Sequence, residues 1–215
     1  KQKTAYEIPK RDWSSDVCSS DLVEQIDQAA EALLTLWQQR ARCDGLSQAC
    51  RPGTRTDGYA VQQAMGEKQS HALFGWKIAA TSIEGQRHIA VNGPLAGRLY
   101  TDRVLRDGAS VPMENNLMQV AEIEFAFRFA RSLPPLSQQY TVAEVLDAVA
   151  CVHPSIEVPD SRYNDFVRAG EAQLIADNAC ANWFVLGPRA DHWQDFDYLN
   201  QAVEVRLNGA VVESG

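Results

Sequence analysis

The residues best suited to chemistry are two glutamates one residue apart, Glu122 and Glu124, in the segment EIEFAFRF. Alternate side chains of a strand point to opposite faces, so the two carboxylates share one face. Ile123 and three phenylalanines share the other face, and we expect them to pack into a core. Adjacent like charges stay ionised at low cost only beside water or a cation. The pattern therefore indicates either a solvated acidic face, with Arg128 paired to Glu124, or a metal site.

A third carboxylate, Glu157, lies in a short apolar segment, SIEVPD. In a strand, Ile156 and Val158 point one way and Glu157 the other. Three carboxylates offer only oxygen ligands, which suit Mg²⁺ or Mn²⁺ better than zinc. Spacing alone leaves open whether Glu157 meets the other two glutamates.

Lys77 is the remaining candidate for acid–base chemistry, in the apolar run LFGWKIAA. Only two lysines, Lys68 and Lys77, follow residue 22. A lysine, unlike an arginine, can lose its proton when it is desolvated, which suits proton transfer. The alternative is an edge-strand lysine whose amine reaches water, and the residue types leave both interpretations open.

Composition excludes several classes of function. The formal net charge is −8, with no basic run, which argues against nucleic acid or an anionic membrane as partner. No apolar stretch approaches the roughly 20 residues that span a bilayer. The cysteines form no CxxC pair, so we predict a reduced, cytoplasmic setting. Cys151 and Cys180 stand in apolar contexts and are predicted to be buried thiols rather than nucleophiles.

Both ends of the chain look non-native. Residues 1–22 match the translation of a sequencing-library adapter, so we expect them to be irregular, with Trp13 and Val17 exposed. We also expect truncation at the C-terminus, because the last predicted strand leaves a sheet edge uncovered. Val211 and Val212 should then be exposed.

The elements that must position these residues fall into two regions, which together predict an α+β fold. Residues 23–72 form a helical N-terminal region: apolar residues recur at helical spacing from Val23 to about Arg42, and a second helix follows Thr56. From residue 73 to 215, short apolar runs bounded by Gly, Pro and Asn predict a β-rich domain.

Two local patterns refine the β-rich domain. The segment TVAE, which begins at Thr141, is a capping box that starts one more helix. Its buried face is predicted to contain Val142, Val145, Leu146 and Val149. Further on, alternating apolar residues precede Asn208-Gly209, the strongest short hairpin pattern, so a β-hairpin is expected to end the chain.

Several blocks of the sequence resemble the 2-keto-4-pentenoate hydratases of the fumarylacetoacetate hydrolase superfamily. The blocks occur in family order and cover nearly all of the chain after residue 22. They are FGWKIAATS (74–82), EIEFAF with SLP (122–127 and 132–134), VHPSIEVPDSRY (152–163), and IADNA with FVLG (175–179 and 184–187).

The resemblance implies that Glu122, Glu124 and Glu157 hold Mg²⁺ or Mn²⁺ and that Lys77 is catalytic. It also implies a mixed β roll of the fumarylacetoacetate hydrolase C-terminal-domain type, incomplete at the C-terminus, in a homo-oligomer. The implied reaction is the addition of water to a 2-hydroxy-alka-2,4-dienoate or 2-oxo-alkenoate in aromatic catabolism. The alternatives are a 4-oxalocrotonate-type decarboxylase, a C–C bond hydrolase of the same superfamily, and an inactive fragment.

Departures from the family concern the substrate-binding residues, for which we expect Leu95, Asp177 and Cys180. Relatives often read PDFG where this chain reads PLAG, so Leu95 replaces an acidic group. Many relatives carry Ser where Cys180 stands. From the residues alone, Asp177 and Asn178 either line the pocket or shape a turn. The exact substrate is therefore expected to differ from that of better-known relatives.

Overall fold

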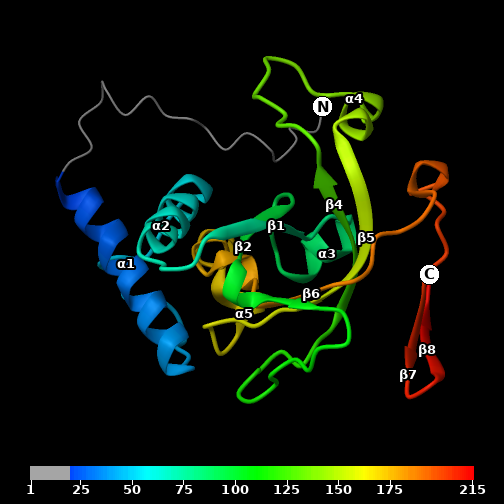
Figure 1. The fold of residues 1–215 in the computed structure, drawn as a ribbon. Coiled ribbons are helices and arrows are strands. Elements are labelled where there is room, and N and C mark those ends of the chain that lie inside the picture. Colours follow the sequence, from blue (N-terminus) through cyan, green and yellow to red (C-terminus); the bar gives the residue numbers. More distant parts are fainter. Residues whose placement is uncertain (1–19) are drawn as a thin grey trace. The chain divides into compact units, whose positions relative to one another are not determined.

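The structure is a computed structural model that describes residues 20–215 (Figure 1). Most of the predicted adapter-derived segment, with Trp13 and Val17, lies outside the described residues. The described chain forms two compact units. The first contains residues 20–104, Val111–Val120 and Val158–Trp183, and the second contains Leu105–Ser110, Ala121–Glu157 and Phe184–Gly215. Between residues 20 and 215, no helix has the length and apolar character required to cross a bilayer.

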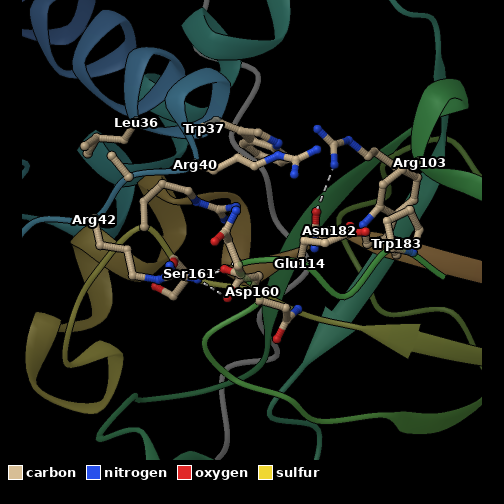
Figure 2. A pocket seen from close by; sticks show the side chains of 15 residues that line it. Leu36, Trp37, Arg40, Arg42, Arg103, Glu114, Asp160, Ser161, Asn182 and Trp183 are labelled. Atoms are coloured by element: carbon tan, nitrogen blue, oxygen red, sulfur yellow. Dashed lines mark hydrogen bonds and ion pairs between the residues drawn. The ribbon is translucent and has the colours of Figure 1, made fainter.

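The first unit contains the predicted helical region and one small sheet. Its elements are α1 (Ser20–Gln39), α2 (Arg55–Glu67), β1 (Leu73–Ala79), α3 (Ile83–His88), β2 (Leu95–Tyr100), η1 (Thr101–Arg103), α5 (Phe166–Ala169), α6 (Glu171–Ala176) and η2 (Asn178–Cys180). The predicted first helix is confirmed as α1, which packs beside α2 (Figure 1). It begins at Ser20, so the prediction of irregular structure is wrong for residues 20–22. It buries Ala29, Ala30 and Leu33 against Val61 and Met65 of α2. At the end of α1, Trp37 stacks against Arg103 (Figure 2).

Helix α2 begins slightly earlier than the sequence predicts. Thr54, not Thr56, is its N-cap, because the Thr54 side chain accepts a hydrogen bond from the Asp57 amide and the Asp57 carboxylate accepts one from the Thr54 amide. This reciprocal capping box satisfies two amides that the first helical turn leaves without intrahelical partners.

Strands β1 and β2 form an antiparallel pair in which Lys77 lies opposite Gly97. An added Cβ at Gly97 would lie 2.3 Å from the carbonyl oxygen of Asn178. The Asn178 amide also bonds to β2, accepting from the Arg98 amide at 2.6 Å and donating to the Arg98 carbonyl at 2.9 Å. The Asn178 side chain thus binds β2 much as a neighbouring strand would.

Because Asn178 approaches β2 so closely, we expect position 97 to require glycine. Gly97→Ala is expected to lower the free energy of unfolding by about 1–3 kcal/mol, because β2 must move away from Asn178 to admit a methyl group. Gly75→Ala, in the partner strand β1, is the matched control, since no atom lies within 4 Å of its added Cβ. Urea unfolding of both variants measures the difference. Equal destabilisation of the two would show that the contact with Asn178 is not the cause.

The second unit is built mainly of strands and contains only part of the predicted β-rich region 73–215, because β1, β2, α5 and α6 belong to the first unit. Its sheet has the strand order β3-β6-β5-β4. The elements are β3 (Val104–Arg106), β4 (Glu122–Phe129), α4 (Val142–Asp147), β5 (Val149–Val158), β6 (Trp183–Leu186), η3 (Trp193–Asp195), β7 (Glu204–Leu207) and β8 (Ala210–Ser214). Strands β4 and β5 run side by side as an antiparallel pair (Figure 1).

The apolar face of β4 differs from the prediction. Ile123, Phe127 and Phe129 are exposed, and only Phe125 is partly buried in the core cluster around Val149 and Val152. Tyr198 supplies aromatic cover, with its ring centroid 5.9 Å from that of Phe125 and 5.4 Å from that of Phe127. One ring cannot enclose four large side chains, so the expected burial of the whole face is wrong.

Helix α4 starts as predicted but buries less than expected. Thr141 and Glu144 form the capping box. The predicted buried face is wrong at Val142, which is 76% exposed. The helix has only six residues, and Val149 already belongs to β5, where it is buried. A six-residue helix has fewer than two turns, so too few of its side chains lie on one face to form a continuous buried apolar surface.

The predicted hairpin is confirmed by β7 and β8, which pair in antiparallel fashion around Asn208-Gly209. Both turn residues have positive φ, 53° and 85°, which is the backbone that two-residue hairpin turns require. Val211 and Val212 are exposed, as expected.

Candidate active site

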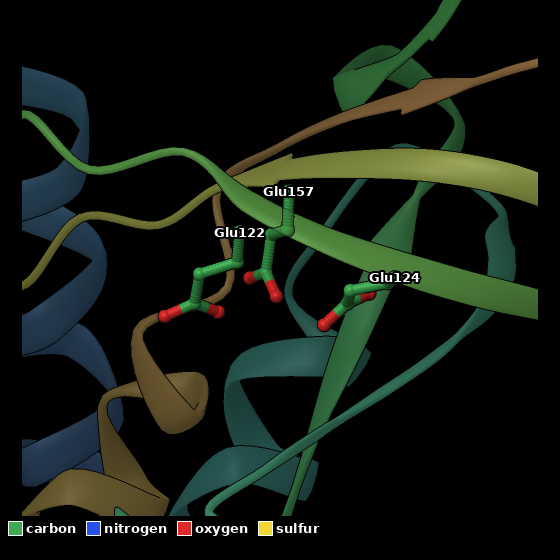
Figure 3. Close-up of side chains that lie close together, drawn as sticks. All are labelled: Glu122, Glu124 and Glu157. Atoms are coloured by element: carbon green, nitrogen blue, oxygen red, sulfur yellow. The ribbon is translucent and has the colours of Figure 1, made fainter. Parts of the chain in front are cut away.

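The three predicted carboxylates, Glu122, Glu124 and Glu157, are brought together by strand register. In the β4–β5 pair Glu122 lies directly opposite Glu157, and Glu124 lies opposite Ser155. Opposite residues of an antiparallel pair project from the same face, and the diagonal neighbour two positions along also comes within reach. One carboxylate oxygen from each glutamate lies within 4.8 Å of the others (Figure 3).

The three glutamates differ in their exposure to solvent. Glu157 is fully buried at 0% exposure, Glu124 is half-buried and Glu122 is exposed. A solvated acidic face would expose all three, so that interpretation does not describe Glu157. Two negative charges 4.8 Å apart repel by about 3.5 kcal/mol at an effective dielectric constant of 20. A hard divalent cation would offset this repulsion, and oxygen-only donors are the ligands it prefers.

Lys77 is positioned by β1 and is only 4% exposed. The alternative of an edge lysine that reaches bulk water is therefore wrong. Because Lys77 and Gly97 are cross-strand partners, the Lys77 side chain projects from the same face as the Gly97 position that Asn178 approaches. Lys77 also exerts an electrostatic effect on Cys180, which follows Asn178 by two residues.

The turn beside Lys77 has an unusual backbone. Asn178, Ala179 and Cys180 have φ values of 56°, 50° and 61°, a left-handed conformation that is unfavourable for residues with a Cβ. The two hydrogen bonds from Asn178 to Arg98 hold this turn against β2. Of the two possibilities that the sequence left open, shaping a turn describes Asn178. Strained backbone of this kind persists only where the surrounding structure over-determines it.

Two of the predicted substrate-binding residues, Asp177 and Leu95, lie in the core of the first unit. Asp177 is fully buried, and its carboxylate accepts hydrogen bonds from Ser161 Oγ at 2.8 Å and from the backbone and guanidinium of Arg162. Burial raises the pKa of Asp177, and Arg162 and Ser161 oppose that rise. Leu95 is buried in a cluster with Leu174 and Ile175. Their contact with substrate stays a prediction.

Cys180 is buried, as predicted for an unreactive thiol. Burial first, and the charge of Asp177 second, raise the pKa of Cys180 to about 12, although Lys77 and Arg162 oppose this. Below that pKa the thiol stays protonated, and only the thiolate is an effective nucleophile.

The high pKa leads to a specific alkylation pattern. In iodoacetamide at pH 8, Cys180 of the folded chain is expected to stay unmodified, whereas the partly exposed Cys50 is labelled. After unfolding in urea, both should be labelled. Peptide mass spectrometry of the quenched samples measures each site. Labelling of native Cys180 as fast as Cys50 would contradict the burial of its thiol.

The first unit brings together a group of arginines and tryptophans that the sequence did not predict. Arg40, Arg103 and Arg162 stand far apart in the chain but line one cavity with Trp37 and Trp183. Arg103 contacts both rings, and Arg162 contacts that of Trp37. No spacing rule links positions so distant, so sequence offers no pattern that would have predicted the group.

No family model matches the chain. It is 33% identical to the 2-hydroxypent-2,4-dienoate hydratase of Pseudomonas putida, over 74% of this chain and 72% of the relative. It is 30% identical to 2-keto-4-pentenoate hydratase 1 of Dechloromonas aromatica, over 87% of this chain and 72% of that relative. The matched part spans from 59% to 73% of the lengths of the curated relatives.

A solved structure shows the same fold. The 4-oxalocrotonate decarboxylase from Pseudomonas putida G7, complexed with magnesium and adipate, superposes with a TM-score of 0.78 at 25% identity, covering 90% of this chain and 73% of that one. The fold and the carboxylate cluster thus define a mixed helix-and-strand protein with a candidate centre for a hard cation. The chain belongs to the 2-keto-4-pentenoate hydratase family.

Proposed function

We propose that this chain is a metal-dependent hydro-lyase that adds water to a 2-hydroxy-alka-2,4-dienoate or its 2-oxo-alkenoate tautomer. The observation that carries the proposal is the convergence of Glu122, Glu124 and Glu157 in a member of the hydratase family. These residues would hold Mg²⁺ or Mn²⁺. When bound, the cation supplies Lewis-acid stabilisation of the negative charge that develops on the 2-oxo acid.

Lys77 is the proposed catalytic residue of the chain. Its amine, shielded from bulk water in β1, either transfers a proton to or from the substrate or binds the substrate carboxylate. Cys180, Asp177 and Leu95 are the proposed substrate contacts. For Cys180 the electrostatic effect of Lys77 supports the proposal, because it places the thiol in the lysine's surroundings.

The second candidate is a 4-oxalocrotonate-type decarboxylase. It is favoured by the TM-score of 0.78 to the solved decarboxylase. The same stabilisation of negative charge on a 2-oxo acid serves either reaction. Cleavage of the C–CO₂ bond and addition of water to the conjugated alkene both deliver an electron pair to the 2-oxo group as an enolate. The proposed architecture of the strands is a mixed β roll of the fumarylacetoacetate hydrolase type. A homo-oligomer and a cytoplasmic location stay predictions.

One assay separates the two candidates. The purified chain is incubated with Mg²⁺ or Mn²⁺ and either 2-hydroxypenta-2,4-dienoate or 4-oxalocrotonate, and loss of dienoate absorbance and release of CO₂ are followed. We expect hydration of the dienoate that stops with EDTA and returns with added metal. Faster CO₂ release from 4-oxalocrotonate would favour the decarboxylase. No turnover of either substrate with metal present would identify an inactive fragment.

A further inference from the structure

A cavity in the first unit is lined by four arginines and two tryptophans (Figure 2). Its volume is about 80 Å³, enough for several water-sized groups. No residue of the carboxylate cluster lines it. The arginines are Arg40, Arg42, Arg103 and Arg162, and the tryptophans are Trp37 and Trp183.

The tryptophan rings hold two of the guanidinium groups in place. The guanidinium carbon of Arg162 lies 4.2 Å from the centroid of the Trp37 ring. That of Arg103 lies 5.4 Å from the same ring and 4.7 Å from the ring of Trp183. An aromatic face attracts a cation, so these contacts fix the guanidinium planes before any ligand arrives.

Some of the N–H donors of the cavity's arginines already donate hydrogen bonds within the protein, and others do not. Arg42 is committed to Asp160, at 2.8 and 2.9 Å, and to backbone carbonyls. Arg103 uses Nε on Asp102, at 3.3 Å, and Nη1 on the Asn182 side chain, at 3.2 Å. Arg162 bonds to Asp177 through Nε and Nη2. Within residues 20–215, no hydrogen bond involves Arg103 Nη2 or Arg162 Nη1.

Three of the four arginines are paired with a carboxylate: Arg42 with Asp160, Arg103 with Asp102 and Arg162 with Asp177. Within the described part of the chain, the Arg40 side chain makes no hydrogen bond or ion pair, and its guanidinium group faces that of Arg103 (Figure 2). Burial lowers the pKa of Arg103, and repulsion by Arg162 and Arg40 lowers it further, whereas Asp102 opposes this. A bound anion would offset the repulsion among the three guanidinium groups.

We propose that this cavity binds a small oxyanion of the carboxylate or phosphate class, held by Arg40, Arg103 and Arg162. A guanidinium group presents paired N–H donors that match two oxygens of such an anion. Glu114 is exposed and also lines the cavity, so its negative charge opposes binding. The site is separate in composition from the proposed metal centre and does not depend on the proposed lyase activity.

The test is a titration of the metal-free chain with inorganic phosphate and, separately, malonate. Ionic strength is held constant with chloride, because screening weakens exposed charge interactions. Calorimetry and tryptophan fluorescence report binding, since Trp37 and Trp183 line the cavity. We expect one saturable site with a dissociation constant of about 1 mM or tighter for at least one of the anions. Their relative affinities distinguish a phosphate from a carboxylate ligand.

Three variants identify the cavity as the place of binding. Arg40→Gln is expected to weaken binding about tenfold, because one charge-assisted interaction is lost. Arg40 is exposed, so this variant should fold normally. Glu114→Gln is expected to tighten binding by roughly two- to fivefold through removal of a like charge. Arg131→Gln removes an exposed arginine from the second unit and should change nothing.

Two results would overturn the proposal. One is the absence of saturable binding of either anion. The other is an affinity of Arg40→Gln equal to that of the parent chain. A double variant, Glu122→Gln with Glu124→Gln, removes two carboxylates that could hold a contaminating cation and, through it, the anion. It should bind the anion as the parent does.

Discussion

Replacement of Glu157 by glutamine is expected to lower lyase turnover by roughly 10³-fold, because loss of the metal removes several kcal/mol of transition-state stabilisation. Glu157 is the fully buried member of the cluster, and its carboxylate lies within 4.8 Å of the other two. Glutamine keeps the size of the side chain but removes the negative charge that would hold the cation between them.

The metal itself provides the second measurement. A ligand that binds only the folded state stabilises it, so Mg²⁺ or Mn²⁺ should raise the melting temperature of the parent chain but not of Glu157→Gln. Glu213→Gln, on the exposed strand β8, is the matched control and should keep both the turnover and the metal-induced shift. An equal metal-induced shift in the parent and in Glu157→Gln would remove Glu157 from the proposed metal centre.

The second large effect is expected for Lys77→Met, which should lower turnover by roughly 10²–10⁴-fold through loss of a proton-transfer group. Methionine keeps the length and packing of the buried side chain, so the variant is expected to fold. Residual turnover should also lose the limb of the pH–rate profile that reports the Lys77 amine. That readout separates acid–base chemistry from a packing role.

Lys68→Met is the control for this experiment. Lys68 lies at the surface, 3.4 Å from Asp27 and 3.3 Å from Glu31, and surface ion pairs contribute little to stability. We therefore expect Lys68→Met to retain the turnover and pH profile of the parent chain. Near-normal turnover in Lys77→Met would exclude Lys77 from the mechanism.

Features that depend on neighbouring residues were predictable from the sequence. The two-residue period of a strand was enough to place Glu122 and Glu124 on one face. Capping patterns located the start of α4, and Asn208-Gly209 located the final hairpin. These features depend on backbone geometry over a few residues, so distant parts of the chain do not alter them. The family blocks added the expectation of a third ligand at Glu157.

Tertiary structure decided what depends on residues distant in sequence. The β4–β5 register places Glu157 opposite Glu122, and a shift of one residue would have turned it to the other face. Burial of Lys77, exposure of most of the apolar face of β4, and the exposed Val142 depend on what packs against each element. The arginine-lined cavity joins residues 40, 103 and 162. Packing partners and strand register arise only when the chain folds, because no local pattern specifies which distant side chain will be adjacent.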